Sequence, residues 1–285
     1  MKRLINYHIY GIVRMLLFAL ACTSVSFAYA DDFGLWTEAG VDKGFGKKFG
    51  VGSEIGFRIN DNLGSFTRFD LGFSANYKPM RGLKFSTGYI FIDQHNPREV
   101  KTGFNKEGAW NGFNVDHNYW RLKHRIYIDA TGKIDVGRFT FSLRERYQLT
   151  FYQAKTVTRD RYRGIVQEDY DGEKLYGEYD GQGRWYAYNE TAEDRKAAKT
   201  KHYLRSRIGV EWNIRHCPVD PFATFEISNN LGKGFALDKR RWTLGADWKI
   251  TKQHTLTAAY VYTNGNDDDD ENNLHAISIG YKYKF

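Results

Sequence analysis

The C-terminal segment 274–285 alternates strictly between two kinds of residue. Every second position is apolar, aromatic or histidine: His275, Ile277, Ile279, Tyr281, Tyr283 and Phe285. The positions between them are small or basic: Ala276, Ser278, Gly280, Lys282 and Lys284. A period of two predicts a β-strand with one apolar and one polar face. An apolar outer face, a polar inner face and a terminal aromatic are typical of the closing strand of a transmembrane β-barrel.

The N-terminal residues have the pattern of a signal peptide. Lys2, Arg3 and Arg14 are basic, residues 15–29 are mostly apolar, and Ala28-Tyr29-Ala30 has the small-x-small pattern of a cleavage site. We therefore expect residues 1–30 to be a signal peptide and residues 31–285 to be the barrel. An alternative is cleavage before Cys22 and lipidation of that residue, which the sequence leaves open.

Composition agrees with strands that cross a membrane. After residue 30, no stretch approaches the ~20 consecutive apolar residues of a membrane helix, and mean hydropathy is −0.62. Aromatics nevertheless make up 16% of the chain, and a barrel places such rings on its lipid face and at both interfaces. Loss of the leader would lower the net charge from +8 to +5, a mild excess spread along the strands, so we expect no nucleic-acid partner. Only Cys217 would then remain, which excludes an internal disulfide.

The same period of two recurs along the chain. It predicts further strands at residues 51–59, 68–77, 83–92, 120–130, 137–152, 203–213, 222–228, 241–249 and 254–263, and a possible first strand at 33–41. Short connections alternate with the longer polar segments 93–118, 153–201, 229–238 and 264–273, as periplasmic turns alternate with outer loops. Within 153–201, residues 163–166, 174–179 and 184–188 could form a hairpin extension or a cap. Because bacterial single-chain barrels have even strand numbers, we expect an all-β, antiparallel barrel of ten or twelve strands with long outer loops.

Short motifs on these strands resemble the Bacteroidetes outer-membrane family called domain of unknown function 2490. They are Leu35-Trp36, Glu54 with Arg58, Arg68-Phe69, Leu71-Gly72-Phe73, Tyr77, Gly88-Tyr89, His124-Arg125, Arg144 with Arg146-Tyr147, Leu204-Arg205 with Arg207, and the terminal strand. The resemblance covers roughly residues 33–285. It implies an outer-membrane barrel without an agreed activity, and it transfers no catalytic residue.

Charged residues gather on the predicted inner face. The set is Glu54, Arg58, Arg68, Asp70, Arg121, Lys123, Arg125, Arg144, Arg146, Arg205, Arg207, Glu211, Glu226, Arg241 and Asp247. One interpretation is a plugged lumen in which these charges satisfy one another, because an unpaired buried charge is costly. The other follows from the excess of bases, which would make the lumen a narrow conduit or binding site for small anions such as phosphate or carboxylate.

Three polar residues have the parity of the predicted lipid face: His124, Glu145 and Ser206. With the hairpin turning near Gly132-Lys133, His124 would lie opposite Phe141 or Leu143, and Glu145 would be on a diagonal. Ser206 as nucleophile, His124 as base and Glu145 as its orienting group would make an outer-membrane lipid hydrolase. An interfacial depth, or a bulge that turns Glu145 inward, explains the same residues.

Two acidic runs are weak candidates for divalent cations. They are Asp267, Asp268, Asp269, Asp270 and Glu271, and the segment 168–173. Oxygen-rich clusters suit such cations, but neither run has the full spacing of a calcium loop. We therefore expect solvated turns, no cofactor, and a monomer in the outer membrane of a Gram-negative cell, in contact with outer-membrane lipid and lipopolysaccharide.

Overall fold

A computed structural model describes residues 32–104, 110–163, 177–179, 185–265 and 273–285. The chain forms two compact units. One comprises the described part of Met1–Ile90 together with Ile126–Leu149 and Lys201–Phe285, and the other comprises Phe91–Arg125 and the described part of Thr150–Thr200. Residues 31–285, predicted as a single barrel, are thus divided between a barrel and a second unit.

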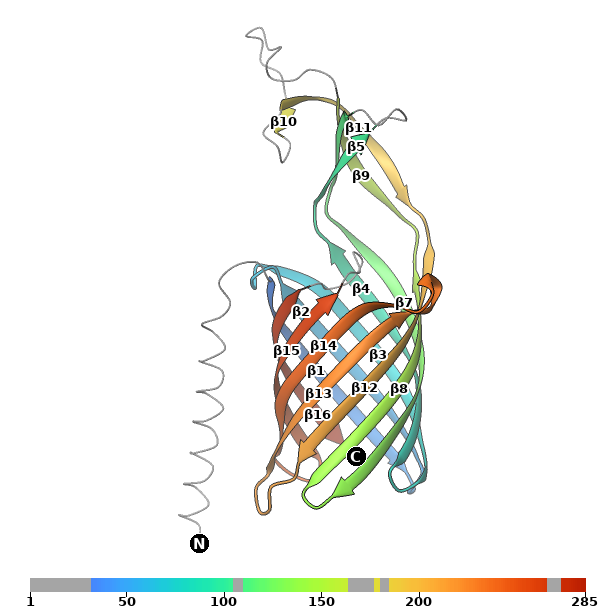
Figure 1. The fold of residues 1–285 in the computed structure, drawn as a ribbon, viewed down its shortest axis with the longest axis vertical. Helices are drawn as coiled ribbons and strands as arrows, with labels where there is room; N and C mark the ends of the chain where they lie inside the picture. The colour runs from blue at the N-terminus through green and yellow to red at the C-terminus, as the bar shows by residue number, and fades with distance from the viewer. Residues whose placement is uncertain (1–31, 105–109, 164–176, 180–184, 266–272) are drawn as a thin grey trace. The chain divides into compact units, whose positions relative to one another are not determined.

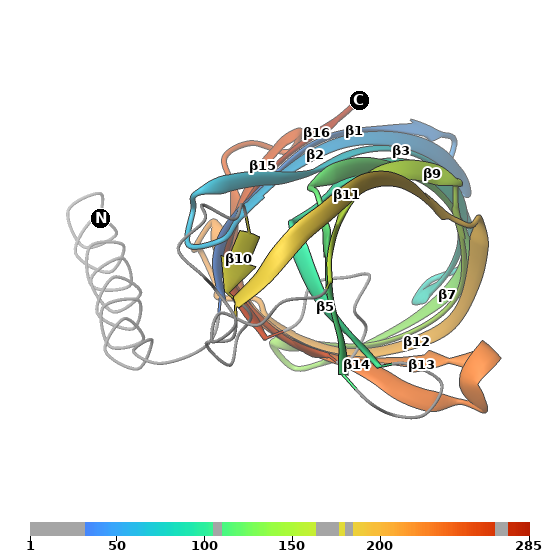
Figure 2. The same cartoon turned by 90° about the horizontal axis from the view of Figure 1, so that it is seen from above.

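The first unit is a closed barrel of long, tilted strands (Figures 1 and 2). The strand order is β1-β16-β15-β14-β13-β12-β8-β7-β4-β3-β2. The strands are β1 (Asp32–Phe45), β2 (Phe49–Asn60), β3 (Ser65–Met80), β4 (Leu83–Asn96), β7 (Tyr119–Val136), β8 (Phe139–Tyr152), β12 (Lys199–Trp212), β13 (Val219–Asn230), β14 (Ala236–Lys249), β15 (His254–Gly265) and β16 (Leu274–Lys284). A short 3-10 helix, η3 (Leu231–Lys233), follows β13. All ten strands predicted from the period of two are confirmed, and the possible first strand is β1.

The two faces of the barrel wall differ as the alternation predicts. Large apolar side chains of one parity are exposed on the outside, among them Phe73, Ile128, Leu143, Ile208 and Leu244, each 51–61% accessible. The opposite parity contains buried charged residues such as Arg68 and Glu226, at 4% and 3%. An apolar exterior around a charged interior is the reverse of a water-soluble barrel.

The barrel closes through a parallel pair, which changes the predicted strand number. Strands β1 and β16 run parallel, with Leu35 opposite Ile277 and Val41 opposite Tyr283. The pairs β1–β2, β2–β3, β12–β13, β13–β14, β14–β15 and β15–β16 are antiparallel. The described chain therefore gives eleven barrel strands, and the expectation of ten or twelve was wrong. An even number is required only if the first and last strands pair antiparallel, and here backbone hydrogen bonding to β16 is satisfied by a parallel β1.

The hairpin between β7 and β8 turns later than expected. β7 continues to Val136, and the turn falls at Gly137-Arg138, where Gly137 has φ 62°. Glycine adopts this left-handed conformation without steric cost. The turn near Gly132-Lys133 was therefore wrong, because residues 130–136 continue the strand. With the later turn, the ring of His124 lies 6.3 Å from that of Phe151 and is not opposite Phe141 or Leu143.

The second unit contains a five-stranded sheet in the order β10-β11-β9-β6-β5. Its strands are β5 (Glu99–Phe104), β6 (Trp110–Asp116), β9 (Lys155–Tyr162), β10 (Gly177–Tyr179) and β11 (Trp185–Lys196). Phe113 and Val115 are almost fully buried, and Phe113 stacks on Tyr162 at 4.6 Å. Pairing of β9 with β11 and of β10 with β11 gives strand pairs within 153–201, as a hairpin extension would, while residues 164–166, 174–176 and 184 of the predicted segments lie outside the described residues. Residues 93–118, expected as a polar loop, also supply two strands of this sheet.

Several predictions concern parts of the chain outside the described residues. They are the signal peptide with its cleavage site and Cys22, the acidic residues Asp267–Glu271, and the acidic segment 168–173. Among the described residues, no helix has the length and apolar character needed to cross a membrane.

Candidate functional site: an arginine belt inside the barrel

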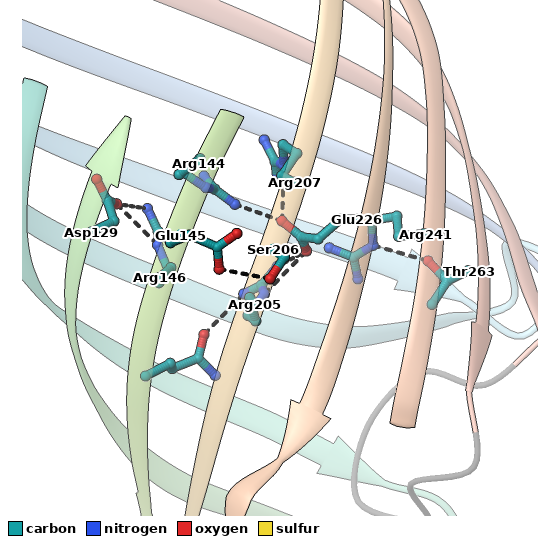
Figure 3. Close-up of polar contacts among 11 residues, drawn as sticks. Asp129, Arg144, Glu145, Arg146, Arg205, Ser206, Arg207, Glu226, Arg241 and Thr263 are labelled. Carbon is teal, nitrogen blue, oxygen red and sulfur yellow. Dashed lines mark hydrogen bonds and ion pairs between the residues drawn. The ribbon is translucent and has the colours of Figure 1, made fainter. Parts of the chain in front are cut away.

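Glu226 on β13 is the centre of the charged interior (Figure 3). Arg144 Nη2 donates to its Oε2 at 2.5 Å, and Arg207 Nε donates to the same oxygen at 2.8 Å. Arg205 donates to Oε1 through Nε at 3.1 Å and also through Nη2. One carboxylate that is 3% exposed thus receives hydrogen bonds from three guanidiniums, so it cannot balance their charge.

The polar contacts continue from Arg144 to its neighbour Arg146 and from there to Asp129 on β7. Arg146 donates to Asp129 Oδ2 through Nη2 at 2.6 Å and through Nε at 3.0 Å. Its guanidinium lies 3.9 Å from the ring centre of Tyr127, a distance at which a cation–π attraction of ~0.5–2 kcal/mol is expected. Arg205 also donates to Gln148 at 2.9 Å. Strands β7, β8 and β12 are therefore linked by polar contacts on one wall of the lumen.

On the opposite side of Glu226, two further arginines lie against the buried indole of Trp36. Trp36 on β1 lies between two guanidiniums, 4.1 Å from Arg58 and 5.0 Å from Arg241. Its Nε1 donates to Asn60, and the ring packs with the buried side chains of Val261, Leu274 and Ala276. Arg241 also donates to Thr263 at 3.1 Å. This apolar cluster fills part of the interior and leaves the guanidiniums at its edge.

The last contacts involve Asp70 on β3. Arg68 donates to Asp70 at 2.8 Å, and Arg58 lies 3.9 Å from the same carboxylate. We call the following residues the arginine belt: Trp36, Arg58, Arg68, Asp70, Asp129, Arg144, Arg146, Arg205, Arg207, Glu226 and Arg241. Seven arginines and three carboxylates give the belt a formal charge of +4. Clustered positive charge favours anions over cations.

The predicted inner-face set is divided by the structure. Arg58, Arg68, Asp70, Arg144, Arg146, Arg205, Arg207, Glu226 and Arg241 belong to the belt. Glu211 lies 4.0 Å from Lys249, and Asp247 accepts from Thr257, both outside the belt. Among the described residues, Glu54 forms no ion pair with an arginine, so the mutual pairing expected for a plugged lumen does not extend to this residue. Arg58 instead lies 3.9 Å from Asp70 on β3.

Arg121, Lys123 and Arg125 fall in the second unit and not in the barrel unit. Arg121 donates to the carbonyl oxygens of Gln153 and Ala197 at 2.8 and 2.6 Å. Lys123 donates to Gln94 at 2.7 Å, and Arg125 to Thr150 at 3.2 Å. Alternation along β7 gave the face of these residues, but one strand supplies residues to both units.

Sequence reasoning missed Trp36, Asp129, Tyr127, Gln148 and Thr263. Asp129 has the same parity as Arg121 and Arg125, so the alternation could have identified it as an inward carboxylate. Trp36 was not identifiable in this way, because its role depends on two strands, β2 and β14, that are distant in sequence.

The three residues proposed for hydrolysis do not form the expected relay. Ser206 Oγ donates to Glu145 at 2.6 Å, whereas Glu145 was expected to orient His124. His124 belongs to the second unit, where its Nε2 is 2.8 Å from Gln153 Nε2 and its ring contacts Phe91 and Phe151. A hydroxyl–carboxylate pair accounts for both polar residues on an apolar outer face, because such groups pair with one another in lipid.

The second unit has its own buried charge cluster, centred on Asp116. This carboxylate, 1% exposed, accepts hydrogen bonds from Arg159 and from Lys196 at 2.6 Å, and Lys101 lies 3.6 Å away. Burial alone raises the pKa of Asp116, but the hydrogen bonds from Arg159 and Lys196 outweigh it and hold this pKa well below its ordinary value. The cluster joins β6, β9 and β11, so its evident role is to hold the sheet together. In the described part of the chain, no group of three or more His, Cys, Asp or Glu is arranged to hold a metal ion.

Comparison with known families gives one decisive match. A family model described as "Protein of unknown function (DUF2490)" matches residues 33–274. The chain belongs to the DUF2490 family. The resemblance seen in the sequence motifs is therefore confirmed over nearly the whole predicted barrel segment.

Solved structures similar to this DUF2490 protein include two barrels. The β-domain of the Bordetella autotransporter BrkA has a TM-score of 0.45 and 14% identity, over 82% of this chain and 78% of that one. A NanC porin has a TM-score of 0.43 and 13% identity, over 90% of this chain and all of that one. No protein with a curated description matches the chain.

Proposed function

We propose that this DUF2490 protein is an outer-membrane barrel whose lumen binds small anions and favours their passage over that of cations. The observation that carries the proposal is the contact of Arg144, Arg205 and Arg207 with the single carboxylate of Glu226. Two of these three positive charges have no carboxylate of their own. An anion that approaches the belt gains charge-assisted hydrogen bonds, while a cation meets repulsion.

Placement in the membrane rests on the two faces of the wall. The exterior of the barrel exposes a large apolar surface, and water would penalise this surface whereas lipid would not. Barrels span membranes because closure satisfies every backbone hydrogen bond, and the β1–β16 pair supplies that closure here. The leader at residues 1–30, the monomeric state and contact with lipopolysaccharide remain predictions.

The proposal is tested by ion selectivity of the refolded full-length protein in a planar bilayer under a KCl gradient. We expect a reversal potential of the sign that indicates chloride preference. Glu226→Gln should strengthen this preference, since it raises the belt charge by one, and Arg205→Gln should weaken it. The matched control is Glu211→Gln, which removes a carboxylate outside the belt. Cation preference in the wild type, or equal effects of the Glu226 and Glu211 substitutions, would refute an anion-selecting belt.

A further inference from the structure

The barrel interior holds a polar cavity of about 210 Å³ beside the arginine belt. A water molecule occupies ~30 Å³ of liquid, so the cavity has room for a solute the size of several waters. Glycines form part of its wall, namely Gly40, Gly52 and Gly72 on β1, β2 and β3. A Cβ atom at Gly72 would meet no atom closer than 3.7 Å, so the missing side chain there leaves usable space.

One side of this cavity has positive charge that is not balanced. Arg144 lines the cavity, and its buried Nε has no hydrogen-bond partner among the described residues. Its Nη2 shares Glu226 with Arg205 and Arg207. Lys84 on β4 lines the same cavity and likewise forms no hydrogen bond or ion pair through its side chain in the described chain. A carboxylate or phosphate oxygen would satisfy the unused guanidinium edge.

The wall built by β1–β3 has a negative charge that also lacks a partner. Glu54 on β2 lines the cavity, and within the described residues its carboxylate accepts no hydrogen bond and lies in no ion pair. Neighbouring acids are occupied elsewhere, since Asp70 accepts from Arg68 and Asp42 lies 4.0 Å from Lys282. Glu54 and Arg144 thus face one cavity without forming a salt bridge to each other. The cavity therefore presents an unused guanidinium edge on one wall and an unpaired carboxylate on the other.

We propose that the cavity binds a small zwitterion, an amino-carboxylate whose carboxylate contacts Arg144 and Lys84 and whose ammonium contacts Glu54. A simple anion is attracted by Arg144 and Lys84 but repelled by Glu54. A simple cation is attracted by Glu54 but repelled by Arg144 and Lys84. A solute that carries both charges satisfies both walls. This inference rests on the proposed function, because it assigns the anion-attracting belt to one end of a particular class of solute.

The test compares three probes of the same skeleton on the refolded full-length protein in detergent. They are β-alanine, which carries both charges, propionate, which lacks the ammonium, and propylamine, which lacks the carboxylate. Equilibrium dialysis should show β-alanine bound at least tenfold more tightly than either of the others. Glu54→Gln should lower β-alanine affinity to that of propionate without weakening propionate itself.

Variants of the basic side complete the test. Arg144→Gln should weaken β-alanine and propionate together, and Lys84→Met gives the same readout if the arginine variant does not fold. Asp247→Asn, outside the belt and the cavity, should leave all three affinities unchanged. Heat-modifiable gel mobility confirms that each variant is folded.

The outcomes separate this inference from the proposed function. Equal binding of β-alanine and propionate overturns the zwitterion site, and so does binding of neither probe. In both cases a wild-type barrel that still prefers chloride keeps the proposed function. A wild-type barrel that shows no preference for chloride refutes the proposed function itself.

Discussion

Replacing Glu226 with glutamine removes the carboxylate that Arg144, Arg205 and Arg207 contact. Glutamine has nearly the same volume, so the substitution leaves no cavity and isolates the effect of charge. Removing one partner of a buried ion pair typically costs ~3–5 kcal/mol, because the remaining charge is left uncompensated. Here three guanidiniums remain, and the glutamine oxygen can still accept a hydrogen bond. We therefore expect a loss of about 3–5 kcal/mol in the free energy of unfolding.

Urea unfolding in lipid vesicles, followed by tryptophan fluorescence, measures this loss. Glu211→Gln is the control, since Glu211 is 30% exposed and lies 4.0 Å from Lys249. Exposed pairs of this kind contribute ~0–1 kcal/mol. In Glu226→Gln combined with Arg144→Gln, removal of one repelling cation should recover part of the loss. If Glu226→Gln were no more damaging than Glu211→Gln, the belt would not depend on this carboxylate and the reasoning would fail.

Three further predictions test other parts of the molecule. On β16, Ile279→Arg should lower the free energy of unfolding in lipid vesicles by ~2–4 kcal/mol, because it places a charge in lipid. The adjacent Gly280→Arg should lower it less, because this position faces the lumen. Equal losses would contradict the assignment of faces. In the second unit, Asp116→Asn should expose the five-stranded sheet to protease while the barrel stays resistant. Because the pKa of Asp116 is held below its ordinary value, its ion pairs stabilise the sheet fully above about pH 4 and progressively less as the pH falls further. Wild-type protein should therefore become cleavable in the sheet in acid. Cleavage that does not depend on pH would count against this role. Purified protein in mixed micelles with calcium should release no fatty acid from phospholipid. Release that is abolished by substitution of Ser206, His124 or Glu145 would instead establish a hydrolase.

Much of the barrel was predictable because side-chain direction in a strand has a period of two. That rule located ten strands and assigned Arg144, Arg205 and Glu226 to the inner face. Alternation also separated lipid-facing from lumen-facing positions near the C-terminus without any knowledge of which strands are neighbours.

Which charges meet could not be read from the alternation. Parity gives the face of a residue, but the partner depends on where each hairpin turns and on which strands close the barrel. The turn at Gly137 placed His124 next to Phe151, and a bulge between Arg58 and Ile59 shifts the register of β2 against β3. In this register Asp70 lies opposite Gly56, and its carboxylate is 3.9 Å from Arg58.

The sequence by itself determined that this chain makes strands with an apolar outer face and a charged inner face, because that alternation is local. The tertiary structure alone decided that β1 joins β16 in parallel to close eleven strands, and that Trp36 lies between Arg58 and Arg241. It also decided that Arg144 and Glu54 line one cavity without pairing. These features depend on contacts between residues far apart in the chain, and such contacts are fixed only when the barrel closes.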